Sequence, residues 1–171
     1  MGVNHHKQQE TPHTCVLACC RMLLSRRGED DFDERELFEE LTAQTHKLDL
    51  AGAAAHLGWH ALPLDFEDPN NLGFIQHLLN DRGLWLVVTV GGPRLATLNQ
   101  RDVRRSRHGQ LATPGDNMPP HHAIVLTATS PAGLSYFDPW FPQTGQPFSM
   151  TVEEFVYMWT GDVCMSEPPF G

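Results

Sequence analysis

The segment "HAIVLTATSPAGLSYFDP", His122 to Pro139, decides the fold class of this chain. Its two apolar halves predict two β-strands, and Ser130-Pro131-Ala132-Gly133 between them has the composition of a tight turn, which predicts a hairpin. Upstream, the continuous apolar run "LWLVVTV" at 84–90 predicts a strand that is buried on both faces. The second half of the chain is therefore predicted to build mainly a β-sheet.

The first half has helical periodicity instead. Apolar residues at spacings of three and four predict helices over residues 15–27, 30–45, 48–58 and 71–82, with a short strand over 59–64. A strand over 147–150 and a helix over 151–159 should close the chain, and Thr151 with Glu154 forms the capping-box pattern of that helix. Helices first and strands after predict an α+β fold.

Length and composition indicate one domain. The chain has 171 residues, of which 40% are hydrophobic, so we expect a single domain over residues 1–171. Residues 91–120 are polar, contain glycine and proline and show no period, which predicts a long loop or insertion before His122. No internal repeat is visible.

The net charge, the targeting features and the cysteine spacing indicate which partners and which cellular location to expect. The formal net charge of −9 argues against nucleic acid as the main partner. The N-terminal residues lack the apolar core of a secretory signal, and no apolar run reaches the roughly 20 residues of a membrane span. Four cysteines without a dense, even spacing indicate a reducing compartment. We expect a cytoplasmic protein without a membrane segment, with export as an effector by another route left open, and oligomeric state undetermined.

Three of the cysteines lie close together in "QQETPHTCVLACC", residues 8–20. Cys15 stands at the predicted start of a helix, where unpaired N–H groups and the helix dipole stabilise a thiolate. Cys19 and Cys20 lie one turn further in, where free cysteine usually packs as a small apolar residue. Cys15 is therefore the candidate nucleophile.

A thiol nucleophile needs a base, and His122 at the start of an apolar strand is the candidate. His121 is its rival, because successive strand residues face opposite ways and only one can address the thiol. Asp138 ends the partner strand and is placed to orient the imidazole. Gln9 can donate its side-chain amide to an oxyanion if the chain turns at Pro12.

These residues resemble the papain-like peptidases that process bacteriocin leaders, over nearly the whole chain. The first motif of that family is similar to Gln9, Cys15, Ala18, Cys19, Met22 and Gly28 here, and its second motif to His122, "AIVL", Asp138 and Pro139. The segments "AAAHLGWHALPL" and "MTVEEFVYMWTG" also look like the family's pattern.

The resemblance implies a stand-alone cysteine peptidase of papain-like fold, with no cofactor and a peptide or protein substrate. By that resemblance Cys15 is the nucleophile, His122 the general base and later acid, Asp138 the orienter and Gln9 the oxyanion donor, and the reaction passes through a thioester. Val16 stands where the family has glycine, which predicts a more crowded cleft beside the thiol. Relatives often carry an export transporter and cut after a double glycine; no ATP-binding or transmembrane segment is present in these 171 residues.

Three alternatives stay open from the sequence. A zinc site would use Cys15, Cys19, Cys20, His5, His6 and His13, although Cys-x3-Cys-Cys is not a paired-knuckle spacing. The same triad also serves a deamidase, an acyltransferase or an isopeptidase in a translocated bacterial effector or toxin. A non-catalytic relative would only bind an extended peptide.

Overall fold

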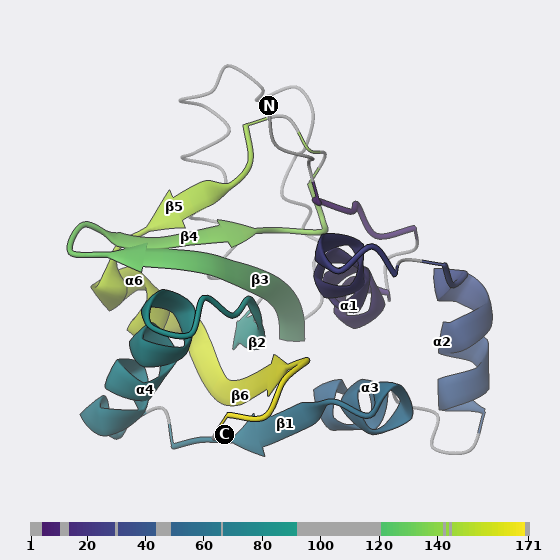
Figure 1. Ribbon diagram of the computed structural model, residues 1–171, viewed down its shortest axis with the longest axis horizontal. Helices are drawn as coiled ribbons and strands as arrows, with labels where there is room; N and C mark the ends of the chain where they lie inside the picture. The colour runs from purple at the N-terminus through teal and green to yellow at the C-terminus, as the bar shows by residue number, and fades with distance from the viewer. Residues whose placement is uncertain are drawn as a thin grey trace.

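The computed structural model describes residues 5–10, 14–29, 31–43, 49–65, 67–91, 121–141, 143 and 145–169. Helices from the first half of the chain pack on a six-stranded antiparallel sheet of order β1-β6-β2-β3-β4-β5 (Figure 1). The elements are α1 (Cys15–Arg26), α2 (Glu34–Thr42), α3 (Leu50–Leu57), β1 (His60–Pro63), α4 (Pro69–Asn80), β2 (Leu86–Gly91), β3 (His121–Ser130), β4 (Gly133–Phe137), β5 (Phe148–Met150), α6 (Val152–Met158) and β6 (Trp159–Met165). The α+β prediction is confirmed.

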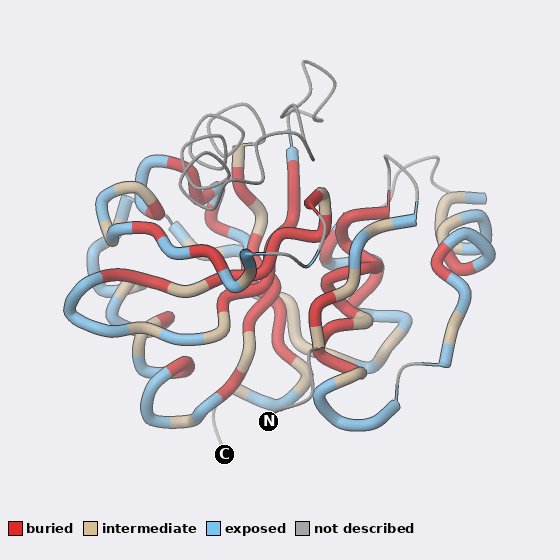
Figure 2. The backbone as a smooth tube through the Cα atoms, turned by 90° about the horizontal axis from the view of Figure 1, so that it is seen from above, coloured by how far each residue is buried: buried red, intermediate tan, exposed pale blue. Residues whose placement is uncertain are grey.

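The sheet separates two apolar cores. Successive residues of the central strands alternate between them: Val88 and Ile124 pack with α4 and α6, whereas Val87 and Val125 pack with α1 and α3. Because both faces are covered, no residue of β2 is exposed and most of them are buried, as the continuous apolar run at 84–90 predicted. Figure 2 shows the buried stretches of the chain gathered in the centre of the molecule. The sheet is therefore the rigid layer on which α1 is placed.

The predicted hairpin and the predicted start of the last helix are confirmed. β3 and β4 pair in antiparallel fashion across the turn at Pro131 and Ala132, with Ser130 opposite Gly133. Gly133 must be glycine, because a Cβ there would lie 2.0 Å from the main-chain oxygen of Met150 in β5. The expected capping box of Thr151 and Glu154 starts α6.

The start of α1 differs from the usual N-cap arrangement. Thr14 immediately precedes the helix but makes no side-chain cap hydrogen bond, and its carbonyl accepts from the N–H of Ala18. The first turn thus keeps N–H groups that are not used by a capping side chain. At the other end Gly28 adopts a positive φ of 76°, and the helix stops one residue before the predicted Arg27.

The sequence reasoning missed one strand, β6. It follows α6 directly at Trp159, with no turn residue between them, and pairs with both β1 and β2 in the middle of the sheet. Gly161 and two exposed polar positions interrupt its apolar pattern, so the sequence pattern placed only Trp159 at the end of the helix over 151–159 and predicted no element for the residues that follow. The predicted loop at 91–120 lies outside the described residues apart from Gly91, which ends β2.

Candidate active site

The first turn of α1 lies beside the start of β3, which brings Cys15 and His122 together from distant parts of the sequence. Cys15 is the first residue of α1, is 8% exposed and packs in the same apolar cluster as Ala123. His122 is the second residue of β3 and is 1% exposed. Helix α1 and strand β3 therefore hold the thiol and the imidazole on two packed elements rather than on loops.

Asp138 is the third residue of the candidate site, after Cys15 and His122. It follows the last residue of β4, and its Oδ1 accepts a hydrogen bond of 2.7 Å from Nε2 of His122. Both side chains are fully buried. The same Oδ1 accepts from the N–H of Trp140 at 2.9 Å, and the Trp140 ring meets the imidazole edge-on at 6.2 Å between centroids. Asp138 is therefore well placed to fix the orientation of His122.

The other ring nitrogen of His122, Nδ1, is the one available to the thiol. It is buried and lacks a hydrogen bond of standard geometry within the described residues. The Cys15 thiol is close enough that the two groups change each other's pKa. The imidazole consequently bonds the carboxylate through Nε2 and interacts electrostatically with the nearby thiol.

The electrostatics favour a thiolate–imidazolium pair. Burial raises the pKa of the Cys15 thiol, but His122 lowers it through its hydrogen bond and charge, as do the N–H groups of Ala123 and Val16, so the net pKa lies below the usual range. Burial lowers the pKa of His122, but the charge and hydrogen bond of Asp138, with a smaller contribution from Cys15, raise it to about 10. Both shifts favour transfer of the thiol proton to the imidazole near neutral pH.

The two neighbouring histidines of β3 have different environments. His121 is exposed, whereas His122 is buried against Asp138. Strand alternation is the physical reason, since consecutive side chains leave the sheet on opposite sides. The structure thus places His122, not its rival, in the line with Cys15.

The sequence also predicted that Gln9 and Val16 lie next to the Cys15 thiol, Gln9 as the oxyanion donor and Val16 as a residue that crowds the cleft. The N–H of Gln9 donates to the carbonyl of Pro139 at 2.8 Å, which puts Gln9 beside the residue that follows Asp138. The turn expected at Pro12 lies outside the described residues. Val16 is buried in the apolar cluster of α1 and presents little surface to solvent.

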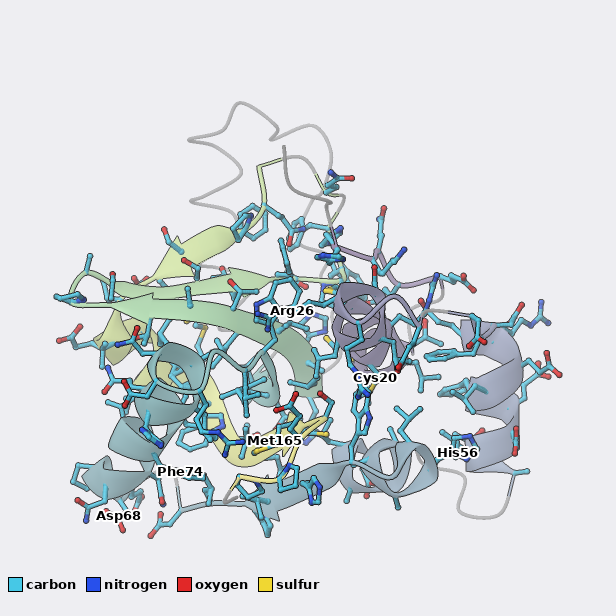
Figure 3. All side chains as sticks on the ribbon, viewed as in Figure 1. Cys20, Arg26, His56, Asp68, Phe74 and Met165 are labelled. Atoms are coloured by element: carbon cyan, nitrogen blue, oxygen red, sulfur yellow. The ribbon has the colours of Figure 1, made fainter. Side chains whose placement is uncertain are left out.

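The remaining cysteines lie in the core. All four cysteines are free thiols, and Cys19, Cys20 and Cys164 are completely buried, which raises the pKa of each. Figure 3 shows Cys20 between α1 and α3, where it packs in the same cluster as Cys164. Among the residues that the structure describes, no group of three or more His, Cys, Asp or Glu side chains is arranged to hold a metal ion; His13 lies outside them.

Two residues of the site were missed by the sequence reasoning. His6 donates from Nε2 to the main-chain oxygen of Asp138 at 3.0 Å, and Gln146 bonds the main chain of the same residue. Neither stands in a recognisable motif. The signals that could have singled them out are weak: a histidine close before Gln9, and a glutamine shortly after the Asp-Pro pair.

A scan against models of known families and a search of curated proteins found no match to this chain. In the described part of the chain, no helix is long and apolar enough to cross a membrane. The function of the protein is therefore inferred from the geometry and electrostatics of the site.

Proposed function

We propose that this protein is a cysteine peptidase of papain-like fold, similar to the bacteriocin-processing leader peptidases. One observation carries the proposal: the buried imidazole of His122 donates to the buried carboxylate of Asp138 at 2.7 Å, and a thiol at the start of a helix is close enough to the same imidazole to change its pKa. Nucleophile, base and orienter in this order are the requirement for covalent catalysis of acyl transfer.

The reaction would begin from the ion pair. The Cys15 thiolate attacks the carbonyl carbon of the scissile peptide bond and forms a tetrahedral oxyanion. The side-chain amide of Gln9 and the N–H of Cys15 itself are the proposed donors to that oxyanion. His122 then gives its proton to the leaving amine, and the C–N bond breaks to leave a thioester on Cys15.

Hydrolysis of the thioester would reverse the proton flow. His122, now neutral, takes a proton from a water molecule, and the resulting hydroxide attacks the thioester carbonyl. The C–S bond breaks, the new carboxylic acid leaves, and the thiolate and imidazolium are restored. Asp138 stabilises the imidazolium in both half-reactions without itself taking the proton.

The test is a peptide-library digest that compares the wild type with Cys15→Ala. Cys20→Ala is the matched control, because it removes a completely buried thiol from the same helix and leaves Cys15, His122 and Asp138 in place. We expect new peptide termini with the wild type and with Cys20→Ala, and none with Cys15→Ala. Termini that persist in Cys15→Ala would overturn the proposal.

The same samples separate the related chemistries. A Cys15-dependent mass change at glutamine side chains, without new termini, would assign a deamidase in place of a peptidase. Cys15-dependent joining of peptides or loss of an isopeptide bond would assign acyl transfer or isopeptidase activity. Retention of intact peptides by wild type and Cys15→Ala alike would instead indicate a binding module.

A further inference from the structure

Asp138 lies just beyond the sheet. The last pairs that β4 makes are Phe137 with Val125 of β3 and Tyr136 with Phe148 of β5. The peptide groups of Asp138 are therefore not held by the strand ladder, although its carboxylate must keep a fixed position relative to His122. Other groups have to hold this main chain in place.

Gln146 holds the main chain of Asp138 at both of its polar atoms. Its Oε1 accepts from the N–H of Asp138 at 2.7 Å, and its Nε2 donates to the carbonyl of Asp138 at 3.0 Å. The same Nε2 also donates to the carbonyl of Phe141 at 3.2 Å. One amide side chain thus replaces the neighbouring strand that Asp138 lacks.

His6 binds the same carbonyl from the N-terminal segment. It is 8% exposed, and its Nε2 lies 3.0 Å from the Asp138 oxygen; since a carbonyl only accepts, Nε2 carries the proton. Its ring packs edge-on against Phe137 at 5.7 Å between centroids. Burial lowers the pKa of His6, partly offset by its hydrogen bond to Asp138, so the neutral ring is favoured.

The segment that carries His6 is itself anchored at several points. Nδ1 of His5 lies 3.1 Å from Oγ of Ser25 near the end of α1. The N–H of Gln9 bonds the carbonyl of Pro139, and the N–H of Glu10 donates to the buried Glu34 at 3.1 Å. His6 is therefore held in place on both sides, and the proposed oxyanion donor Gln9 belongs to the same anchored segment.

We propose that His6 and Gln146 are positioning residues, which together fix the main chain of Asp138 so that its carboxylate stays on Nε2 of His122. They act on the thiol only through Asp138 and His122. The inference rests on the proposed function in that it assigns a role within the same triad, but its test measures the reactivity of Cys15 and needs no substrate.

The experiment is the rate of Cys15 alkylation by iodoacetamide as a function of pH, followed by peptide mass spectrometry. His6→Phe keeps a ring against Phe137 but removes the donor, and His6→Gln restores a donor. Gln146→Glu replaces the donating nitrogen with an oxygen that faces two carbonyls. Gln143→Glu is the matched control, because it makes the same chemical change as Gln146→Glu on an exposed side chain three residues away.

We expect His6→Phe to shift the acidic inflection of the alkylation rate upward by about half a pH unit, which is about a threefold lower rate below the inflection. Gln146→Glu should shift it by about one unit, His6→Gln less than His6→Phe, and Gln143→Glu not at all. A less firmly held carboxylate stabilises the imidazolium less, and the thiolate with it.

An unmoved inflection in both His6→Phe and Gln146→Glu would overturn the inference, even if their melting temperatures fell, because that result describes a purely structural role. A shift in Gln143→Glu equal to that in Gln146→Glu would do the same. If His6→Phe does not fold, Gln146→Glu and His6→Gln decide the question. A wild type that cleaves no peptide would refute the proposed function and leave these rates fully interpretable.

Discussion

The first and second turns of α1 each carry a cysteine, and the pKa values of the two thiols are shifted in opposite directions. Cys15 and Cys19 lie four residues apart on one helix, yet the pKa of Cys15 is lowered and that of Cys19 is raised. Burial raises the pKa of both thiols. At Cys15 the effects of His122 and of the N–H groups of Ala123 and Val16 outweigh burial, whereas at Cys19 nearby negative charges, including Asp138, add to it. The pKa of a thiol on this helix therefore depends less on its position along the helix than on the charged groups near it.

The largest expected effect is a contrast in reactivity between these turns. At neutral pH iodoacetamide should modify Cys15 about a thousandfold faster than Cys19, Cys20 or Cys164, because only Cys15 has thiolate character and partial exposure. Peptide mass spectrometry of a labelling time course measures the ratio. Labelling in urea is the control, since unfolding should make all four alike. Equal rates in the native protein would refute the assignment of Cys15.

The second effect concerns the cause of the contrast. His122→Ala removes the group that lowers the pKa of Cys15 most and leaves only the N–H groups of Ala123 and Val16 to oppose burial, so alkylation at pH 6 should fall about a hundredfold. Measured against pH, the rate should rise only in the alkaline range. His121→Ala, on the exposed neighbour, is the matched control and should leave the rate unchanged. A rate that stays high in His122→Ala would assign the thiolate to the helix dipole instead.

The third effect is a pH profile of turnover, once a substrate is known. Activity requires the thiolate and the imidazolium together, so it should rise with pH through the lowered pKa of Cys15 and fall through the pKa of His122 near 10. Asp138→Asn should move the alkaline limb to lower pH, because the carboxylate raises the pKa of His122. It should also reduce the rate at the optimum at least about tenfold. An unchanged alkaline limb would exclude Asp138 as the orienter.

The smallest effect is on stability. Here we expect the larger effect at Cys19 in the second turn, whereas Cys15 in the first turn has the larger reactivity. Cys19→Ser places a hydroxyl in a completely buried position and should lower the free energy of unfolding by about 1–2 kcal/mol relative to Cys19→Ala. The same pair of substitutions at Cys15, which faces the imidazole, should differ by less. Urea denaturation of the four variants measures both differences. A larger cost at Cys15 would mean that the first turn is primarily structural.

Much of this architecture was predictable because it depends on local patterns. The hairpin of β3 and β4, the capping box of α6 and the buried strand β2 each have a signal contained within a few neighbouring residues. Strand β6 had no such signal. It begins where a helix ends, and its polar residues are compatible with a strand only because the segment pairs with β1 and β2. A strand of this kind is defined by its partners rather than by its own composition.

The candidate site shows the same division. The sequence by itself determined which residue types could act, because a cysteine at a helix start, a histidine opening an apolar strand and an aspartate closing the next one are local features. Only the tertiary structure decided that His122 rather than His121 meets the carboxylate, and that His6 and Gln146 hold Asp138. The physical reason is range: periodicity and capping act over a few residues, whereas a buried hydrogen bond joins groups from opposite ends of the chain and exists only once the sheet has formed.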